Sequence, residues 1–309
     1  MTHPSTPTDQ ISFSSRAWAD LGLLGLIWGG VFLATRLALD EVPVLTLVLH
    51  RVFWAALALW IWVAIKGLSV PRDLRTLGAL LTMGFLNNAL PFALLAWGQL
   101  TIESGLTAIL NATTALFGVL VAAVVFRDER LTRAKVLGVL VGLAGVVVAI
   151  GPAAVLQLDP RSLAQLAVLA GTVSYALAST WGRLTLTGLS PEVAAAGMLT
   201  GATLLLAPVA LWVDGVPSLD LSLTTWSAIG YAALVATAGA YLLYYRVLAA
   251  AGAGNLMIVT LVIPPVAIVL GALVLGETLT AESLVGFALL AVGLLTLNGT
   301  LSWGRRSAR

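Results

Sequence analysis

Ten apolar runs of about 20 residues, separated by short polar segments, constrain the fold of this chain more than any other feature. A helix of that length crosses the roughly 30 Å hydrocarbon layer of a bilayer. Irregular backbone and open sheet edges cannot face lipid. The sequence therefore predicts an all-α integral membrane protein with ten transmembrane helices. We expect these helices at residues 17–39, 44–65, 75–97, 104–126, 133–150, 163–184, 191–213, 225–248, 254–275 and 281–303.

The composition also indicates a membrane protein. Hydrophobic residues make up 60% of the chain and charged residues 10%, whereas soluble domains carry about 25% charged residues. The chain has no cysteine, and its only histidines are His3 and His50. This excludes disulfides, thiolate ligands and a histidine-rich metal cluster. We therefore predict no metal and no cofactor, and a net charge of +2 does not predict a nucleic-acid partner.

Lysine and arginine are distributed unevenly among the connecting segments. If the N-terminus is cytoplasmic, thirteen of them fall inside, only Arg161 falls outside, and Arg36 and Arg51 lie within spans. The excess of basic residues in cytoplasmic loops then predicts that both termini are cytoplasmic. Residues 1–15 are polar and lack a basic region and cleavage site, so we expect a disordered cytoplasmic tail rather than a signal peptide.

The two halves of the chain resemble each other at an offset of 148 residues. Both Glu129 and Glu277 begin the pattern Glu-x-Leu-Thr, and three glycines follow in register. These glycines are Gly138, Gly145 and Gly151 in the first half and Gly286, Gly293 and Gly299 in the second. Each half holds five helices, an odd number, so the second copy enters the membrane from the opposite side. We predict two inverted five-helix repeats, residues 16–151 and 152–309, in one membrane domain. Transporters commonly bind substrate at such a repeat interface, and a purely structural duplication is the alternative.

Several motifs resemble the EamA family of the drug/metabolite transporter superfamily. They are Trp28-Gly29-Gly30 with Arg36, Pro43, Arg51, the aromatic stretch 241–245, Gly252, Pro264, and Gly276-Glu277 followed by Gly286 and Gly293. One departure is that the ninth span has Pro264-Pro265 where the fourth has Leu116-Phe117, although the family often has a proline in both. Within the family, the chain is most similar to bacterial exporters of aromatic and other bulky apolar amino acids.

This resemblance implies a bacterial inner-membrane transporter that exports small metabolites by alternating access around a cavity between the repeats. The implied partners are the lipid bilayer and a small-molecule substrate, with the protein a monomer or homodimer. A multidrug or other metabolite exporter is the alternative within transport. An intramembrane enzyme is the alternative of another class, but it would need a nucleophile with a base, paired aspartates or a metal motif. The sequence has none of these, so we assign no catalytic residue.

Polar side chains near mid-membrane are costly unless they are paired or wetted, so they are candidates for the cavity wall. Trp28 joins them because it lies mid-span, outside the interfacial aromatic belt. Hydrogen bonding between helices is the alternative role. The candidates for substrate binding are Trp28, Asn87, Asn88, Asn111, Tyr175, Tyr241 and Pro264. We also expect helix bends at Gly29-Gly30, Pro91 and Pro264-Pro265, where backbone polar groups would be freed.

Arg51 lies roughly 12 Å into the second span at the rise of an α-helix. An arginine at this depth needs a compensating partner. It is a candidate contact for a substrate carboxylate, and the alternatives are backbone carbonyls or pairing with Asp40 or Glu41.

No Asp or Glu lies deep in any span. Proton-driven export of cationic drugs typically needs a membrane carboxylate, so this favours a zwitterionic or neutral substrate. The fifth and tenth spans are almost purely aliphatic and glycine, and Gly138 and Gly142 form a Gly-x-x-x-Gly pattern typical of close helix packing. We interpret these two spans as scaffold or a dimer contact rather than part of the transport pathway. We also expect Thr132 and Thr280 to cap the helices that follow them.

Overall fold

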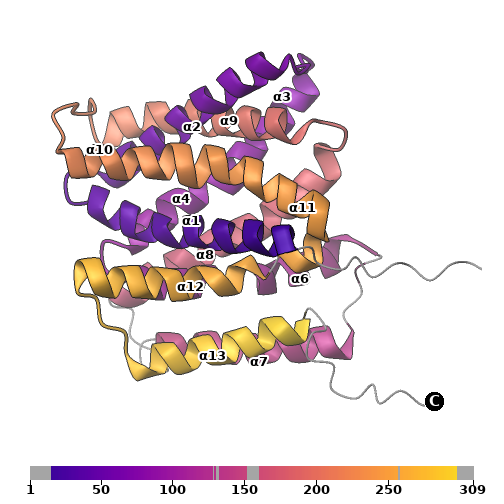
Figure 1. Cartoon of the computed structure of the whole chain (residues 1–309), viewed down its shortest axis with the longest axis vertical. Helices are drawn as coiled ribbons and strands as arrows, with labels where there is room; N and C mark the ends of the chain where they lie inside the picture. Colours follow the sequence, from indigo (N-terminus) through magenta and orange to yellow (C-terminus); the bar gives the residue numbers. More distant parts are fainter. Residues whose placement is uncertain (1–14, 128, 130–131, 152–159, 257, 298–309) are drawn as a thin grey trace, which may run out of the picture.

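The computed structural model describes residues 15–127, 129, 132–151, 160–256 and 258–297, and these form a bundle of long helices (Figure 1). Three helices contain a wider π-helical stretch, labelled η. In chain order the elements are α1 Ser15–Ala38, α2 Val44–Lys66, α3 Leu74–Gly84, η1 Phe85–Ala89, α4 Leu90–Gly98, α5 Ser104–Asn111, α6 Thr114–Val125, α7 Arg133–Ile150, α8 Pro160–Thr185, α9 Pro191–Val213, α10 Leu223–Gly230, η3 Tyr231–Gly239, α11 Ala240–Leu256, α12 Val259–Leu270, η4 Gly271–Leu275 and α13 Ala281–Leu297.

These elements form ten helical segments, which confirms the predicted all-α membrane fold. Eight segments are long and apolar enough to cross a membrane, and the ninth and tenth, 259–275 and 281–297, are shorter apolar helices. One boundary is wrong, because α11 continues to Leu256 and the ninth segment begins at Val259 rather than residue 254. Residues 249–253 are four alanines and one glycine, and alanine is the strongest helix former. The predicted tail and both termini lie outside the described residues.

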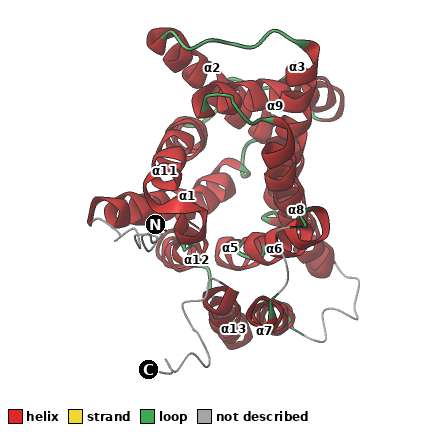
Figure 2. Cartoon of the chain, turned by 90° about the vertical axis from the view of Figure 1, so that its right-hand side faces the viewer, coloured by secondary structure: helices red, strands yellow, loops and turns green. Residues whose placement is uncertain are grey.

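The fifth helix of each half packs against the other, α7 against α13, at one edge of the molecule (Figure 2). A Cβ added at Gly138 would lie 2.7 Å from the carbonyl oxygen of Gly293, and one at Gly145 would lie 2.6 Å from that of Gly286. Residue numbers rise along α7 as they fall along α13, so the two equivalent helices run antiparallel. This is the relation that inverted repeats require.

The second helix of each half pairs in the same way, α2 with α9. Thr46, near the start of α2, donates its backbone N–H and its hydroxyl to Asp214 at the end of α9, at 2.8 and 2.9 Å. Near the other end of α2, the indole of Trp60 donates to the hydroxyl of Thr200 at 2.8 Å. The two helix pairs, α2–α9 and α7–α13, therefore join the halves at opposite edges of the bundle (Figure 2).

Two of the π-helical stretches occupy equivalent positions in the two halves. At the repeat offset, η1 corresponds to residues 233–237, which lie within η3. In η1 the amide of Leu90 donates to the carbonyl of Phe85, five residues back. Pro91 follows directly, and proline has no N–H to continue the ordinary pattern. The predicted irregularity at Pro91 is thus present, as a widened turn of the kind often found at functional sites.

At the other two predicted bends the helices are not interrupted. Helix α1 continues through Gly29 and Gly30, and α12 continues through Pro264 and Pro265. The glycines serve close packing instead, since a Cβ at Gly29 would lie 2.5 Å from Cβ of Val266 on α12.

The two predicted threonine caps are confirmed. Thr132 accepts a hydrogen bond from the amide of Lys135, and Thr280 accepts one from the amide of Ser283, both at 3.2 Å. They fix the starts of α7 and α13, the two helices of the glycine-packed pair.

Candidate functional site

Arg51 lies inside the bundle on α2 without a carboxylate partner among the described residues. Its Nε donates to the hydroxyl of Thr237 at 2.9 Å, and its guanidinium carbon lies 3.7 Å from the centre of the Phe92 ring. A desolvated cation over an aromatic ring contributes about 2 kcal/mol. The two terminal nitrogens have no hydrogen bond within the described part of the chain, and neither is sealed from solvent. Arg51 thus has donors left for another group.

The two acids expected as alternative partners of Arg51 are engaged elsewhere. Asp40 pairs with Arg36 at 2.6 Å. Glu41 accepts a hydrogen bond from the backbone N–H of Ser222 at 2.9 Å. Hydrogen bonds from Ser222 lower the pKa of Glu41, which keeps this carboxylate ionised. Neither acid pairs with Arg51.

Two adjacent amides of η1 meet one phenol of α11. Asn88 Nδ2 donates to the hydroxyl oxygen of Tyr241 at 2.8 Å, and Asn87 Nδ2 donates to the same oxygen at 3.1 Å. Asn88 is fully buried, yet its Oδ1 has no hydrogen-bond partner. Leaving a buried polar atom unpaired typically costs about 1–3 kcal/mol. Asn88 therefore has a buried carbonyl oxygen that could accept a further hydrogen bond.

Tyr175 of α8 completes this group. Its ring lies 6.5 Å from that of Phe92 in an edge-on arrangement. Tyr175 and Tyr241 both pack against the hydrophobic cluster that contains Phe92, the ring that lies under the guanidinium of Arg51. The structure thus brings together five predicted site residues and adds two that the sequence did not single out for this site. We call these seven residues the polar cluster, namely Arg51, Asn87, Asn88, Phe92, Tyr175, Thr237 and Tyr241.

The other three predicted site residues lie outside the polar cluster. The indole of Trp28 donates to the carbonyl of Ala236 at 3.1 Å, on the residue of η3 next to Thr237. Asn111 ends α5, and its buried Oδ1 has no partner. Pro264 is buried within α12. Trp28 and Arg51 therefore attach to consecutive residues of η3, while Asn111 and Pro264 have no described contact with the cluster.

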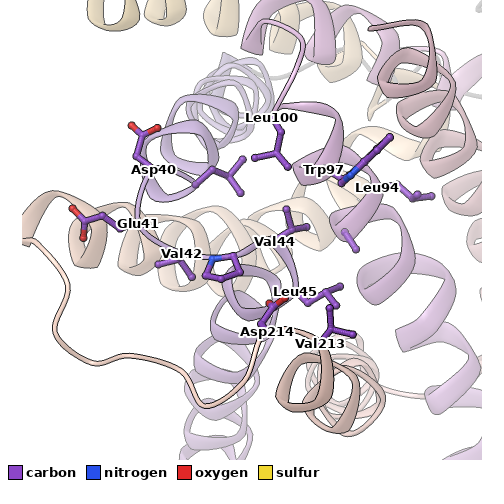
Figure 3. A pocket seen from close by; sticks show the side chains of 13 residues that line it. Asp40, Glu41, Val42, Val44, Leu45, Leu94, Trp97, Leu100, Val213 and Asp214 are labelled. Atoms are coloured by element: carbon purple, nitrogen blue, oxygen red, sulfur yellow. The ribbon is translucent and has the colours of Figure 1, made fainter. Parts of the chain in front are cut away.

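A cavity of about 740 Å³ opens at one end of the bundle (Figure 3). It is bordered by the segment that joins α1 to α2 and by the C-terminal ends of α4 and α9. Its lining is mostly apolar and includes Val44 and Trp97. Val44 lies seven residues before Arg51, so both occupy the same face of α2, roughly 10 Å apart along the helix. This end also carries Asp40, Glu41 and Asp214, and we call it the acidic end.

A smaller cavity of about 240 Å³ lies at the opposite end, between α9 and α11. Tyr245 and Arg246 are part of its lining, and Tyr245 lies one helical turn beyond Tyr241. We call this the basic end, because Lys66, Arg133 and Arg183 also lie there. Along the helices, the polar cluster lies between the two cavities.

Carboxylates at the acidic end hold the two halves together. Glu277, in the loop before α13, accepts hydrogen bonds from the backbone N–H of Ser104 at 3.0 Å and from its hydroxyl at 2.9 Å. These bonds cap the start of α5 in the other half. Glu103 pairs with Arg161 at 2.8 Å. With the Asp214–Thr46 and Glu41–Ser222 bonds, four described acids of this end, Glu41, Glu103, Asp214 and Glu277, take part in contacts between the two halves.

Three kinds of comparison relate this chain to known proteins. The model of the "EamA-like transporter family" matches residues 18–151 and 162–299. A solved structure of a chain with 20% sequence identity superposes with a TM-score of 0.65, covering 91% of this chain and 96% of the other. The second comparison supports the fold alone.

Two sequence relatives with transporter names match this chain over most of their length. A probable terminal-alkyne amino-acid exporter of Streptantibioticus cattleyicolor is 30% identical over 262 residues, which cover 84% of this chain and 85% of the relative. An uncharacterized transporter of Archaeoglobus fulgidus is 26% identical over 260 residues, covering 83% and 89%.

Proposed function

This chain belongs to the EamA-like transporter family, and we propose that it exports small metabolites, above all aromatic and other bulky apolar amino acids. Transport would proceed by alternating access to the polar cluster from the cavities at the two ends. The observation that carries the proposal is Arg51, a cation inside the bundle whose terminal nitrogens have no described partner. A cation at this depth is costly unless something compensates it, and a substrate carboxylate would do so.

The surroundings of Arg51 suit an amino acid with a large apolar side chain. Ligand pockets usually combine an apolar lining with a few placed polar groups. Here Phe92 and Tyr175 offer aromatic surface, and the Asn88 amide offers an unpaired polar atom. The similarity to a probable amino-acid exporter supports the same substrate class. Trp28, which is hydrogen-bonded to η3 beside Thr237, would extend the aromatic wall.

The charge distribution favours one orientation in the bacterial inner membrane. Most of the described lysines and arginines lie at the basic end, and cytoplasmic loops are enriched in these residues. We therefore place the basic end and both termini in the cytoplasm. A reporter fused after Arg309 should be active on the cytoplasmic side, and activity on the outer side would reverse the orientation.

Substrate-dependent efflux tests the proposed function. Cells that express the protein should lose preloaded phenylalanine several times faster than cells without it, while a cationic dye should leave at the control rate. Export of the dye without export of phenylalanine would instead identify a multidrug exporter. No accelerated loss of either compound would contradict both interpretations.

A further inference from the structure

The polar cluster contains a positive charge but no negative one. Apart from Arg51, its members carry neutral amides, hydroxyls and rings. Every described Asp and Glu lies in a connecting segment or within the first six residues of a helix. At the basic end, Asp20 pairs with Arg246 at 3.2 Å, and Glu192 lines the smaller cavity. A bound ammonium would thus meet no carboxylate in the cluster.

The unpaired amide of Asn88 does not change the charge of the polar cluster, because an amide is neutral. Its Oδ1 is buried without a partner, while Nδ2 donates to Tyr241. If the amide were rotated, the Tyr241 hydroxyl would donate to Oδ1 and Nδ2 would become the unpaired atom. In both arrangements Asn88 offers one neutral hydrogen-bonding group, which accepts from an ammonium in the first case and donates to a carboxylate in the second.

Arg51 is oriented for a planar anion. Stacking on Phe92 and the Nε bond to Thr237 restrain the guanidinium plane, and the two terminal nitrogens remain. Two parallel N–H donors match the two oxygens of a carboxylate, and such charge-assisted pairs are roughly twice as strong as neutral hydrogen bonds. The geometry therefore supplies strong recognition for one of the two charges of an amino acid.

We propose that this site recognises the carboxylate of its substrate and does not require the ammonium, so that it binds arylalkanoic acids and other bulky monocarboxylates as well as amino acids. This inference rests on the proposed function and extends it to a wider substrate class. Removal of the ammonium also removes the cost of taking a second charge out of water. Removal of the carboxylate leaves Arg51 without an anion.

Isothermal titration calorimetry on the full chain in nanodiscs tests this inference with four phenyl compounds. Phenylalanine has both charges, 3-phenylpropanoate only the carboxylate, and phenylalaninamide and 2-phenylethylamine only the ammonium. We expect 3-phenylpropanoate to bind within about threefold of phenylalanine or more tightly. The two amines should bind at least about tenfold more weakly, because a charge-assisted bond is lost. Direct binding avoids the leak of protonated acid through the bilayer that complicates a transport assay.

The possible outcomes separate the two proposals. If phenylalanine binds and 3-phenylpropanoate does not, the ammonium is required and this inference is wrong, while the proposed function stands. If 3-phenylpropanoate binds and phenylalanine does not, the carboxylate site stands and amino-acid export is wrong. If neither binds, both are wrong. In an Arg51→Gln variant the preference for the acid over the amines should shrink to within about threefold, and a preference that survives this change would also overturn the inference.

Discussion

The α7–α13 pair and the polar cluster both lie where helices of the two halves meet, but they are built from different chemistry. In the pair, Gly138 and Gly145 let one backbone touch the other, and the atoms nearest to these glycines belong to backbone and to leucine side chains. In the polar cluster, an arginine, two amides and a threonine hydroxyl meet aromatic rings, and some of their polar atoms have no partner. The α7–α13 contact is a close backbone contact, whereas the polar cluster has donors and acceptors that are free to bind another molecule. This difference separates scaffold from candidate site more clearly than position in the bundle does.

The largest effect should come from filling the glycine contact. In Gly286→Leu the new side chain would collide with the backbone of α7 at Gly145 and Ala149. Overpacking typically costs about 1–3 kcal/mol and more when backbone must move, so we expect loss of most folded protein. Fluorescence-detected size-exclusion chromatography measures this as the area of the monodisperse peak.

Gly78→Leu is the matched control for this change, because nothing lies within 4 Å of a Cβ at Gly78 in α3. It should give a peak close to that of the wild type. Equal yields from the two variants would mean that the α7–α13 contact is not the close backbone contact described above.

A smaller effect should come from removing one hydroxyl of the polar cluster. Tyr241→Phe takes away the acceptor of both Asn87 and Asn88, so two amide donors lose a partner. We expect phenylalanine efflux to fall several-fold, with a loss of stability of about 1–3 kcal/mol. Efflux rate and melting temperature should be measured on the same preparation.

Tyr231→Phe provides the comparison, since the Tyr231 hydroxyl donates to the carbonyl of Ile27 at 2.8 Å outside the cluster. It should lower the melting temperature by a similar or smaller amount and leave efflux nearly unchanged. If the two variants lost efflux in equal proportion, the hydroxyl of Tyr241 would have only a structural role.

The scaffold could be predicted from the sequence, because each of its features depends on local pattern. Apolar runs give the spans, and the two Glu-x-Leu-Thr motifs place the caps at Thr132 and Thr280. The repeated glycines give the close helix contact. The resemblance to one transporter family was also evident in these motifs and is confirmed by the family match.

The polar cluster could be predicted only in part. Arg51, Asn87, Asn88, Tyr175 and Tyr241 were conspicuous as polar or aromatic groups within apolar spans, but nothing local showed that they meet. Phe92 was missed because a phenylalanine in a membrane helix carries no signal of its own, and its role depends on the guanidinium of Arg51 above it. Thr237 has no distinguishing signal in the sequence, because its bond to Arg51 joins residues 186 positions apart.

The expected helix bends also show that local sequence does not determine tertiary packing. Proline chemistry predicted an irregularity near Pro91, and η1 is present there. Gly29-Gly30 carries a similar local signal, but α12 packs tightly against it and the helix remains continuous. Whether a glycine pair bends a helix or admits a neighbour depends on tertiary packing, which the sequence pattern does not contain.

The central claim is that Arg51 serves the substrate rather than the fold, and a paired measurement on Arg51→Gln tests it most directly. Arg161→Gln is the control, because it makes the same change in an arginine that pairs with Glu103 at the acidic end. Partly exposed ion pairs contribute about 0–1 kcal/mol, so the control should keep both its melting temperature and its phenylalanine efflux. The account predicts that Arg51→Gln melts within a few degrees of the wild type while efflux falls more than tenfold. A variant that keeps wild-type efflux, or one that loses efflux only in proportion to lost folded protein, would contradict it.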